Sequence, residues 1–434
     1  MNLGQDSFLD QLPVGWAFDR FKDVALLRNE RTDEASEMED YLELEDVEPG
    51  TGRILNRRNT LEVVSDVTLF KTGDVLFGKL RPYLEKFYVA EFDGKCTGEI
   101  LAFKPKRIAG RFLFYCLASP WFIARCNLLA YGAKMPRVNW PTQLAQFNLP
   151  LPPLPEQESI AAYLDASCAA IDAAVTAKRR QLETLDGLRK AIINSAVTKG
   201  VGETRALKAT GTDWFPEIPS GWRVIRFKNL FQDIYRYPTY YNIDYVPEGV
   251  PEVRGEALTV EGFIKTLDDE RYIAPETSAQ FPRTQLQLGD IVMSVRGTMG
   301  KIGLVDERYV GANITANLLR LSPDQRLVTG AFLRWVMRST YFNDALNSSA
   351  PQTTIKTITM PQLSKLLISL PPKDEQLRIE SYLHQKTAEI DGIESTIAQQ
   401  ITTLTAYRKS LIHECVTGQR RVTEADLRRA GARG

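Results

Sequence analysis

Two stretches of the chain carry the same pattern of apolar and polar positions. Residues 151–198 and 370–417 align without a gap at a constant offset of 219. Each opens with a pair of prolines, and beyond Glu156 or Glu375 it runs for about forty residues without a further proline, while apolar side chains recur in alternating steps of four and three. Because proline is tolerated only before or within the first helical turn, each stretch predicts one long helix that begins near its proline pair. At about 1.5 Å per residue, such a helix spans roughly 60 Å.

The apolar steps form a heptad seam. Its positions are Leu164, Cys168, Ile171, Val175, Leu182, Leu185, Ile192 and Ala196 in the first copy, and Leu383, Thr387, Ile390, Ile397, Ile401, Leu404, Leu411 and Cys415 in the second. The matching register predicts that the two helices pack on each other as an antiparallel coiled coil, with Ile171, Leu185, Ile390 and Leu404 buried. The alternative is that each helix packs separately on its own domain.

The segments before each helix also recur, which indicates a duplicated domain. A Gly-Trp segment opens each half at an offset of 206, and a Gly-Asp strand follows at an offset of 216. Framework segments are therefore shared while the material between them differs in length. Each half is expected to be mixed α/β. The expected elements are strands at 75–78 and 291–295, a hairpin turn at Asp93-Gly94, and helices at 111–129 and 330–346.

Basic, small-residue loops follow the Gly-Asp strands, and each half also has a later polar loop. The cations of the first half are Lys79, Arg81 and Lys86, followed by Lys134 and Arg137; those of the second are Arg296 and Lys301, with Thr298 beside them, and Lys356. Lysine and arginine suit phosphate contacts, and arginine can also hold guanine with two hydrogen bonds. We expect these residues to face DNA, with Arg81 and Arg296 the base readers. The alternative is that the loops only connect strands.

Composition is that of a soluble globular chain. The chain has 434 residues, 44% of them hydrophobic and 25% charged, which allows two to four domains. The N-terminus lacks a signal-peptide pattern, no apolar run reaches membrane-spanning length, and the five cysteines show no metal-ligand spacing. We therefore expect a cytoplasmic protein with buried, reduced thiols and no membrane partner.

Charge is balanced overall but unevenly spread. The 54 Lys and Arg residues cancel the 54 Asp and Glu residues. Residues 29–48 hold ten acidic residues and one basic, whereas residues 70–137 hold twelve basic residues and five acidic. A local excess of positive charge matters more to a polyanion than the total does, so a nucleic-acid partner remains compatible with this sequence.

Catalytic motifs are missing from the sequence. The two histidines, His384 and His413, both lie within the second long helix, and neither a phosphate-binding loop nor a dinucleotide fingerprint is present. Asp74 with Asp93 and Lys95 could form a nuclease-like acidic pair, but the second half does not repeat it. The sequence thus favours recognition over catalysis.

Taken together, these motifs resemble the specificity subunit of a type I restriction–modification system. The resemblance rests on the half-chain repeat, the Gly-Trp and Gly-Asp segments, and the Leu-Pro-Pro-x-x-Glu-Gln entry to each helix, at 151–157 and 370–376. It covers essentially the whole chain. The second copy departs from the usual motif at Lys373-Asp374, and the acidic stretch at 30–48 matches no family motif.

The resemblance implies a DNA-recognition subunit without catalysis of its own. Two target-recognition domains would each read one half of a split, asymmetric site in double-stranded DNA, and the two long antiparallel coiled-coil helices would fix the spacing between the halves. A duplicated reader on a rigid spacer also suits half-sites about one turn of DNA, roughly 34 Å, apart. The helices would dock two adenine-methyltransferase subunits, with restriction/translocase subunits joining them. S-adenosylmethionine, ATP and magnesium would bind only to those partners, so no cofactor or metal is expected here.

The expected domains are residues 1–152 and 201–370 for recognition, with a linker at 199–217, residues 153–200 and 371–418 for the helices, and a basic tail at 419–434 that is partly disordered. The fold class is mixed α+β with pseudo-two-fold internal duplication. The competing classes are a stand-alone or fused DNA nuclease or methyltransferase reader, and a structural coiled-coil adaptor.

Overall fold

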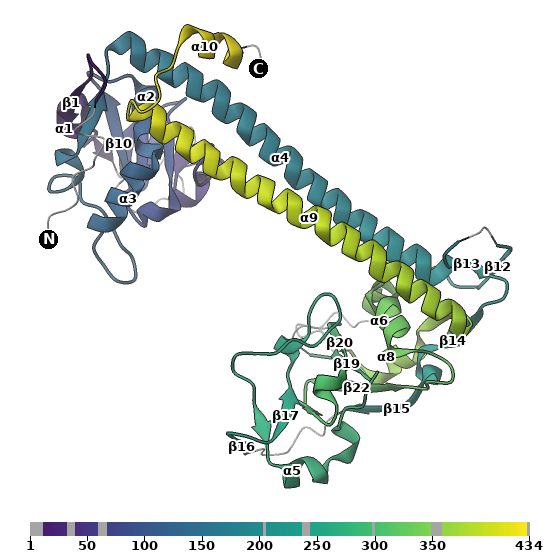
Figure 1. Ribbon diagram of the computed structural model, residues 1–434. Helices are drawn as coiled ribbons and strands as arrows, with labels where there is room; N and C mark the ends of the chain where they lie inside the picture. The colour runs from purple at the N-terminus through teal and green to yellow at the C-terminus, as the bar shows by residue number, and fades with distance from the viewer. Residues whose placement is uncertain are drawn as a thin grey trace. The chain divides into compact units, whose positions relative to one another are not determined.

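The computed structural model describes residues 12–32, 40–59, 67–202, 205–236, 244–296, 300–348 and 358–431. Its contacts divide the chain into two units, Met1–Arg179 with Ile397–Gly434, and Arg180–Thr396. Each unit thus holds one α/β domain, part of the first long helix and part of the second (Figure 1).

The first unit is built on a four-stranded sheet of order β2-β10-β7-β8 and a five-stranded sheet of order β3-β6-β9-β4-β5. A two-stranded pair, β1-β11, closes the segment before the long helix. The strands are β1 Ala17–Arg20, β2 Ala25–Leu27, β3 Arg31–Thr32, β4 Asp40–Leu42, β5 Arg58–Asn59, β6 Val67–Phe70, β7 Val75–Gly78, β8 Phe87–Val89, β9 Gly94–Cys96, β10 Ile100–Pro105 and β11 Asn148–Leu151; the helices are α1 Phe21–Val24, α2 Gly110–Ala118 and α3 Pro120–Leu129.

The second unit repeats this plan. Its main sheet has the order β15-β22-β19-β20, its smaller sheet β16-β18-β17-β21, and its closing pair is β14-β23. The strands are β12 Leu207–Ala209, β13 Glu217–Pro219, β14 Arg223–Arg226, β15 Phe231–Arg236, β16 Tyr245–Val246, β17 Val250–Val253, β18 Tyr272–Ile273, β19 Ile291–Ser294, β20 Ile302–Leu304, β21 Asn313–Ile314, β22 Leu318–Pro323 and β23 Leu367–Leu370; the helices are α5 Pro275–Gln280, α6 Gly330–Arg338, α7 Thr340–Ser348 and α8 Met360–Lys365. The predicted duplication and the Gly-Asp strands are confirmed.

The two long helices are α4, Leu154–Lys199, and α9, Lys373–Val416. In the first unit Asp172 of α4 lies 3.1 Å from Arg408 of α9, and in the second unit Arg189 of α4 lies 2.6 Å from Asp391 of α9. Asp172 precedes Arg189 along α4, whereas their partners Arg408 and Asp391 come in the opposite order along α9. The two helices are therefore antiparallel, as predicted. Both ion pairs join the same Asp and Arg of the repeat, at an offset of 219.

Burial varies along the seam. Ile171 and Ile390 are buried as expected, whereas Leu185 and Leu404 are half-buried. Burial does not simply follow the domain cores, because Ile390 is buried outside both cores, whereas Leu404 packs against the first unit's core and stays half-buried. The ends of both helices belong to the domain cores, so packing on the partner and packing on a domain occur together.

The glutamine that enters each long helix joins that helix to a domain. Gln157 Oε1 accepts from Ala109 N (2.8 Å) and its Nε2 donates to Pro152 O (2.8 Å). Gln376 repeats this arrangement by accepting from Thr329 N (3.0 Å) and donating to Pro371 O (3.0 Å). Both glutamines are almost fully buried. Each glutamine accepts a hydrogen bond from the N-cap N–H of a domain helix, α2 or α6. That N–H is one of the backbone donors that have no partner within the helix.

Four expectations differ from the structure. The first concerns the predicted single helices at 111–129 and 330–346, each of which is two helices broken at a buried serine, Ser119 or Ser339. Pro120 starts α3, and Ser119 Oγ accepts from Phe122 N to cap it. Both serines also donate to a preceding carbonyl, Ser119 Oγ to Cys116 O (2.8 Å) and Ser339 Oγ to Val336 O (2.6 Å), so α6 ends in the same way without a proline after it.

Second, Asp93-Gly94 is not a hairpin turn. Strands β8 and β9 on either side of it belong to different sheets. Asp93 instead accepts from Thr72 N at 2.8 Å, and a Cβ on Gly94 would come within 2.6 Å of Asp40 O. Glycine is needed here for close backbone approach and not for a tight turn.

Third, most of the C-terminal tail is ordered. Residues Glu424–Gly431 form helix α10, and Thr423 and Asp426 cap it reciprocally, with Thr423 Oγ1 accepting from Asp426 N. Ala430 is buried against the first unit's core. Capping and one apolar face suffice to fold a segment whose composition alone favoured disorder.

Fourth, α4 is long and apolar enough, by length and composition alone, to cross a membrane, and the bent pair α2–α3 would qualify if counted as one span. The sequence expectation was that no run reaches that length. Alanines between the seam residues raise the hydropathy of α4, and its larger apolar side chains, such as Ile160 and Leu164, are buried in the first unit's core.

Replacing Gln157 or Gln376 by alanine should lower the free energy of unfolding by about 1–3 kcal/mol each, because buried backbone groups lose their partners. Chemical denaturation would measure the change. Gln181→Ala, at an exposed position of α4, is the matched control. Losses no larger than the control's would contradict a capping role.

The five cysteines should be unreactive in the folded protein. All are buried, and burial raises the pKa of Cys96 to about 12 and that of Cys168 to about 11. At pH 8 these thiols are neutral and therefore poor nucleophiles. A thiol reagent at pH 8 should label none of the five until denaturant is added. Rapid labelling of the native chain would show that at least one site opens.

Candidate nucleic-acid interface

The segment after β7 forms a tight turn from Arg81 to Glu85. Both end residues adopt left-handed backbone conformations, with φ of 50° and 52°, and they are the non-glycine residues with positive φ in the described part of the chain. Between them Pro82–Leu84 is a single 3-10 turn, in which Leu84 N donates to Arg81 O (2.9 Å). Non-glycine residues persist in this conformation only where their surroundings hold them, and such positions cluster at functional sites.

The two basic loops of the first half, distant in sequence, form one surface. Val138 N donates to Lys79 O (3.0 Å), Arg81 N to Pro136 O (2.7 Å), and Arg81 Nη2 to Lys134 O (3.3 Å). The structure therefore brings together Lys79, Arg81, Lys134 and Arg137. Three large apolar or aromatic side chains lie exposed on the same loops: Tyr83, Tyr131 and Met135.

The cations on these loops differ in their availability. Lys134 is exposed and Lys79 half-exposed, and neither forms an ion pair with a described residue. Arg137 is engaged with Glu99 through contacts of 3.0–3.1 Å. Lys86 donates to Val47 O, and burial lowers its pKa. Arg137 and Lys86 therefore also have structural roles within the domain.

The second half repeats the same juxtaposition. Ile358 N, at the end of the second polar loop, donates to Val295 O (3.2 Å), the counterpart of the bond from Val138 to Lys79. Arg296 is exposed and Lys301 half-buried beside this junction. Thr298 and Lys356 lie outside the described residues.

Part of the acidic stretch stabilises the fold locally. Arg58 of β5 binds Asp46 (3.0 Å), Glu43 (3.2 Å) and Glu45. These carboxylates, Glu45 first, raise the pKa of the Arg58 guanidinium. Asp46 is itself buried. The described acidic residues thus hold β4 and β5 together through one arginine.

The Asp of each Gly-Asp strand is structural. Asp74 is buried and accepts from Lys71 N (2.8 Å) and Arg28 Nε (2.9 Å). Its counterpart Asp290 accepts from Gln287 N (2.9 Å) and Arg320 Nε (2.6 Å). The duplicated turn, together with an arginine that comes from the end of β2 in one half and from β22 in the other, accounts for the recurrence of this aspartate.

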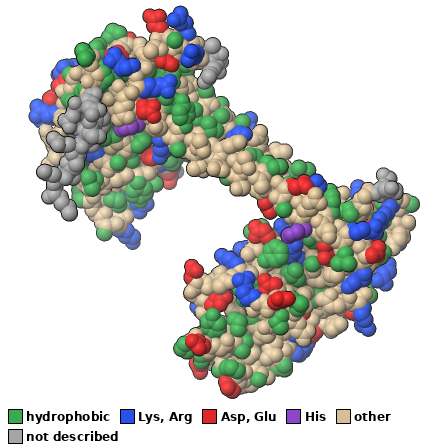
Figure 2. Space-filling view, viewed as in Figure 1, with side chains coloured by type: hydrophobic (Ala, Val, Ile, Leu, Met, Phe, Trp, Pro, Cys, Tyr) green, Lys and Arg blue, Asp and Glu red, His purple; other side chains and the backbone are tan. Residues whose placement is uncertain are grey.

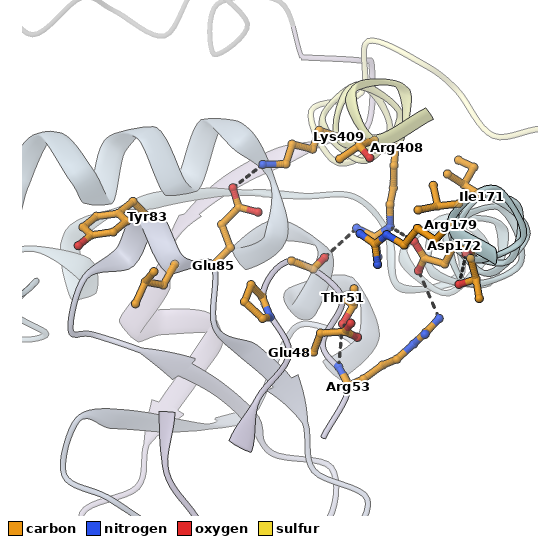
Figure 3. Close-up of a pocket in the computed structure, with 16 residues that line it drawn as sticks. Glu48, Thr51, Arg53, Tyr83, Glu85, Ile171, Asp172, Arg179, Arg408 and Lys409 are labelled. Carbon is orange, nitrogen blue, oxygen red and sulfur yellow. Dashed lines mark hydrogen bonds and ion pairs between the residues drawn. The ribbon is translucent and has the colours of Figure 1, made fainter. Parts of the chain in front are cut away.

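Strongly charged contacts join the first domain to the long helices (Figure 3). Arg408 of α9 donates to Gly50 O (2.9 Å), and its neighbour Lys409 lies 2.5 Å from Glu85. Arg53 lies 3.7 Å from Asp172 of α4. These groups line a cavity of about 390 Å³ between the domain and the helices. No sequence pattern indicated this junction, because its partners lie up to 358 residues apart.

The corresponding junction of the second unit is built differently. The counterparts of Arg408 and Lys409 are Arg189, which binds Asp391 and Glu394, and Lys190, which binds Asp186 of its own helix at 2.7 Å. Within the second domain itself, Arg334 of α6 stacks on Phe263 (4.1 Å) and Trp335 (4.3 Å), and burial lowers its pKa to about 10. Figure 2 shows basic side chains interspersed with acidic and apolar ones over the visible face of each unit.

A protein with two equivalent domains, in each of which the residue after the Gly-Asp strand accepts a backbone hydrogen bond from Val138 or Ile358, belongs to the class of duplicated recognition proteins. The family model described as the type I restriction modification DNA specificity domain matches this chain twice, over residues 13–184 and 222–403. The chain therefore belongs to that family. The resemblance inferred from the repeat and the helix-entry motif is confirmed.

Individual relatives are distant in sequence. The chain is 24% identical over 317 residues to the type I restriction enzyme EcoBI specificity subunit of Escherichia coli, a match covering 71% of this chain and 65% of that protein. It is 25% identical over 374 residues to the putative type I restriction enzyme MjaX specificity subunit of Methanocaldococcus jannaschii, covering 81% and 79%. The match therefore spans just under two thirds of the EcoBI protein.

Two solved structures share the fold. A chain from a study of complex assembly and conformational transition of the type I R-M system superposes with a TM-score of 0.76 at 21% identity, covering 94% of this chain and 99% of that one. The HsdS subunit from Thermoanaerobacter tengcongensis gives 0.55 at 21% identity, covering 94% and 98%. The predicted fold class of two recognition domains and two long helices is confirmed.

Proposed function

We propose that this chain is the non-catalytic specificity subunit of a type I restriction–modification complex. Each recognition domain reads one half of a bipartite, asymmetric site in double-stranded DNA. The observation that carries this proposal is the repeated backbone bond to the residue that follows each Gly-Asp strand, from Val138 to Lys79 and from Ile358 to Val295. Two equivalent frameworks with different loop residues suit two different half-sites.

The long helices set the spacing between the half-sites and dock two adenine-methyltransferase subunits, which restriction/translocase subunits then join. S-adenosylmethionine, ATP and magnesium bind those partners, and the complex acts on DNA in the cytoplasm. The recognition domains span residues 1–152 and 201–370. Family membership and the shared fold support this assembly.

The proposal predicts a methylation pattern. A host that expresses this chain with its methyltransferase partner should carry methyladenine at one split sequence motif, and the motif should vanish when this chain is deleted. Methylome sequencing measures it. The purified chain with S-adenosylmethionine should transfer no methyl groups; transfer by the chain alone would overturn the assignment.

Arg81→Ala and Arg296→Ala should each weaken binding of the assembled complex to its site by about 1–3 kcal/mol and relax one base position, because a guanidinium can hold guanine with two bonds. Lys79→Ala and Lys134→Ala should instead weaken all sequences alike and flatten the salt dependence. Binding to cognate and single-base-altered duplexes at several salt concentrations separates the two effects.

Arg428→Ala is the control, since Arg428 is exposed on α10 and pairs with Glu424 of the same helix. If Arg81→Ala and Arg296→Ala leave affinity and base preference unchanged, the strand-end loops only connect strands. Recognition would then lie in the polar loops at 132–139 and 347–357.

A further inference from the structure

Two neighbouring residues of α9 hold two loops of the first domain. Arg408 Nη1 donates to Gly50 O (2.9 Å), and Lys409 Nζ donates to a carboxylate oxygen of Glu85 (2.5 Å). The two loops are themselves joined, because Gly50 N donates to Glu85 O (2.9 Å). Figure 3 shows Lys409 extending from the helix to Glu85 across the edge of the cavity.

Glu85 is the fixed end of the left-handed turn described above. Its backbone N donates to Pro82 O (2.9 Å), its carbonyl accepts from Gly50, and its side chain binds Lys409. An L-residue in this conformation is unfavourable by itself, so these three contacts determine the shape of the turn. The Lys409 contact is the one that comes from a long helix.

Arg81 lies at the other end of the same turn. The five residues from Arg81 to Glu85 are stiffened by Pro82 and by the bonds from Leu84 N to Arg81 O and from Glu85 N to Pro82 O. Between the two ends Tyr83 is 53% exposed. A shift at Glu85 is therefore transmitted to the side chains that the domain presents outward.

We propose that Lys409 is a positioning residue for DNA reading by the first recognition domain. Through Glu85 it fixes the turn that carries Arg81 and Tyr83, so one long helix sets the geometry of a reading loop. This inference rests on the function proposed above. It adds that α9 takes part in base discrimination by the first domain in addition to setting the spacing of the half-sites.

The duplication supplies an internal control. Lys190, the counterpart of Lys409, donates to Asp186 one turn earlier on α4, and the described residues show no bond from it to the second domain. Lys190 and Lys409 are both substantially exposed, at 57% and 44%. Substituting either residue removes one surface charge, but only Lys409→Ala releases a recognition loop.

The test uses the complete complex of this chain with its methyltransferase partner and the motif found by methylome sequencing. Lys409→Ala should weaken cognate binding about fivefold, the equivalent of the ~1 kcal/mol that one partly exposed ion pair can contribute. Discrimination against single-base changes should fall in one half-site only. Lys190→Ala should leave affinity and discrimination in both half-sites unchanged.

A charge exchange separates positioning from general damage. Glu85→Lys alone should reproduce the loss, and Glu85→Lys combined with Lys409→Glu should restore discrimination in the affected half-site. Unchanged discrimination in Lys409→Ala, equal loss in both half-sites, or no restoration in the exchange would each overturn the inference. Absence of sequence-specific binding by the wild-type complex would instead overturn the proposed function.

Discussion

Burial of the helix ends in the domain cores is the constraint on which the rest of the structure depends. In the first unit Ile160, Leu164 and Leu411 belong to the same core as Phe112 and Phe122. In the second, Ile193, Leu383 and Phe332 share a core in the same way. Each such side chain contributes about 1.5–3 kcal/mol when fully buried. Neither domain can separate from its helix ends without exposing this surface, so each recognition domain and the helix ends packed in it fold as one body.

Polar contacts add direction to this apolar packing. The repeated Asp and Arg of the helices form the pairs Asp172–Arg408 and Arg189–Asp391. Partly exposed ion pairs contribute little free energy, but opposite charges at matched positions select one register and one orientation of a helix pair. The buried glutamines Gln157 and Gln376 then tie each helix start to the N-terminus of a domain helix. The repeated sequence thus encodes two equivalent connections between a long helix and a domain.

The two units differ in the contacts made by the side chains along the long helices. Lys409 and Arg408 reach loops of the first domain, whereas Lys190 and Arg189 bind carboxylates of the helices themselves. In the second domain Arg334 stacks on Phe263 and Trp335 of the same domain. With a shared framework and divergent junctions, each domain is therefore held to the helices by different contacts.

The sequence by itself determined what depends on local pattern. The proline pairs and apolar steps gave both long helices nearly to their ends, and Gly-Asp gave strands β7 and β19. It misjudged the breaks at Ser119 and Ser339, because a serine bonding to a preceding carbonyl ends a helix without changing its apolar periodicity.

Only the tertiary structure decided which charges are available. From sequence, Lys86 and Arg137 are indistinguishable from Lys134; in the fold Lys86 binds Val47 O, Arg137 binds Glu99, and Lys134 is exposed. The contact between Glu85 and Lys409 joins positions 324 residues apart. Composition fixes how many charges a chain carries, but pairing depends on which surfaces folding brings within a few ångströms of each other, and no local pattern records that.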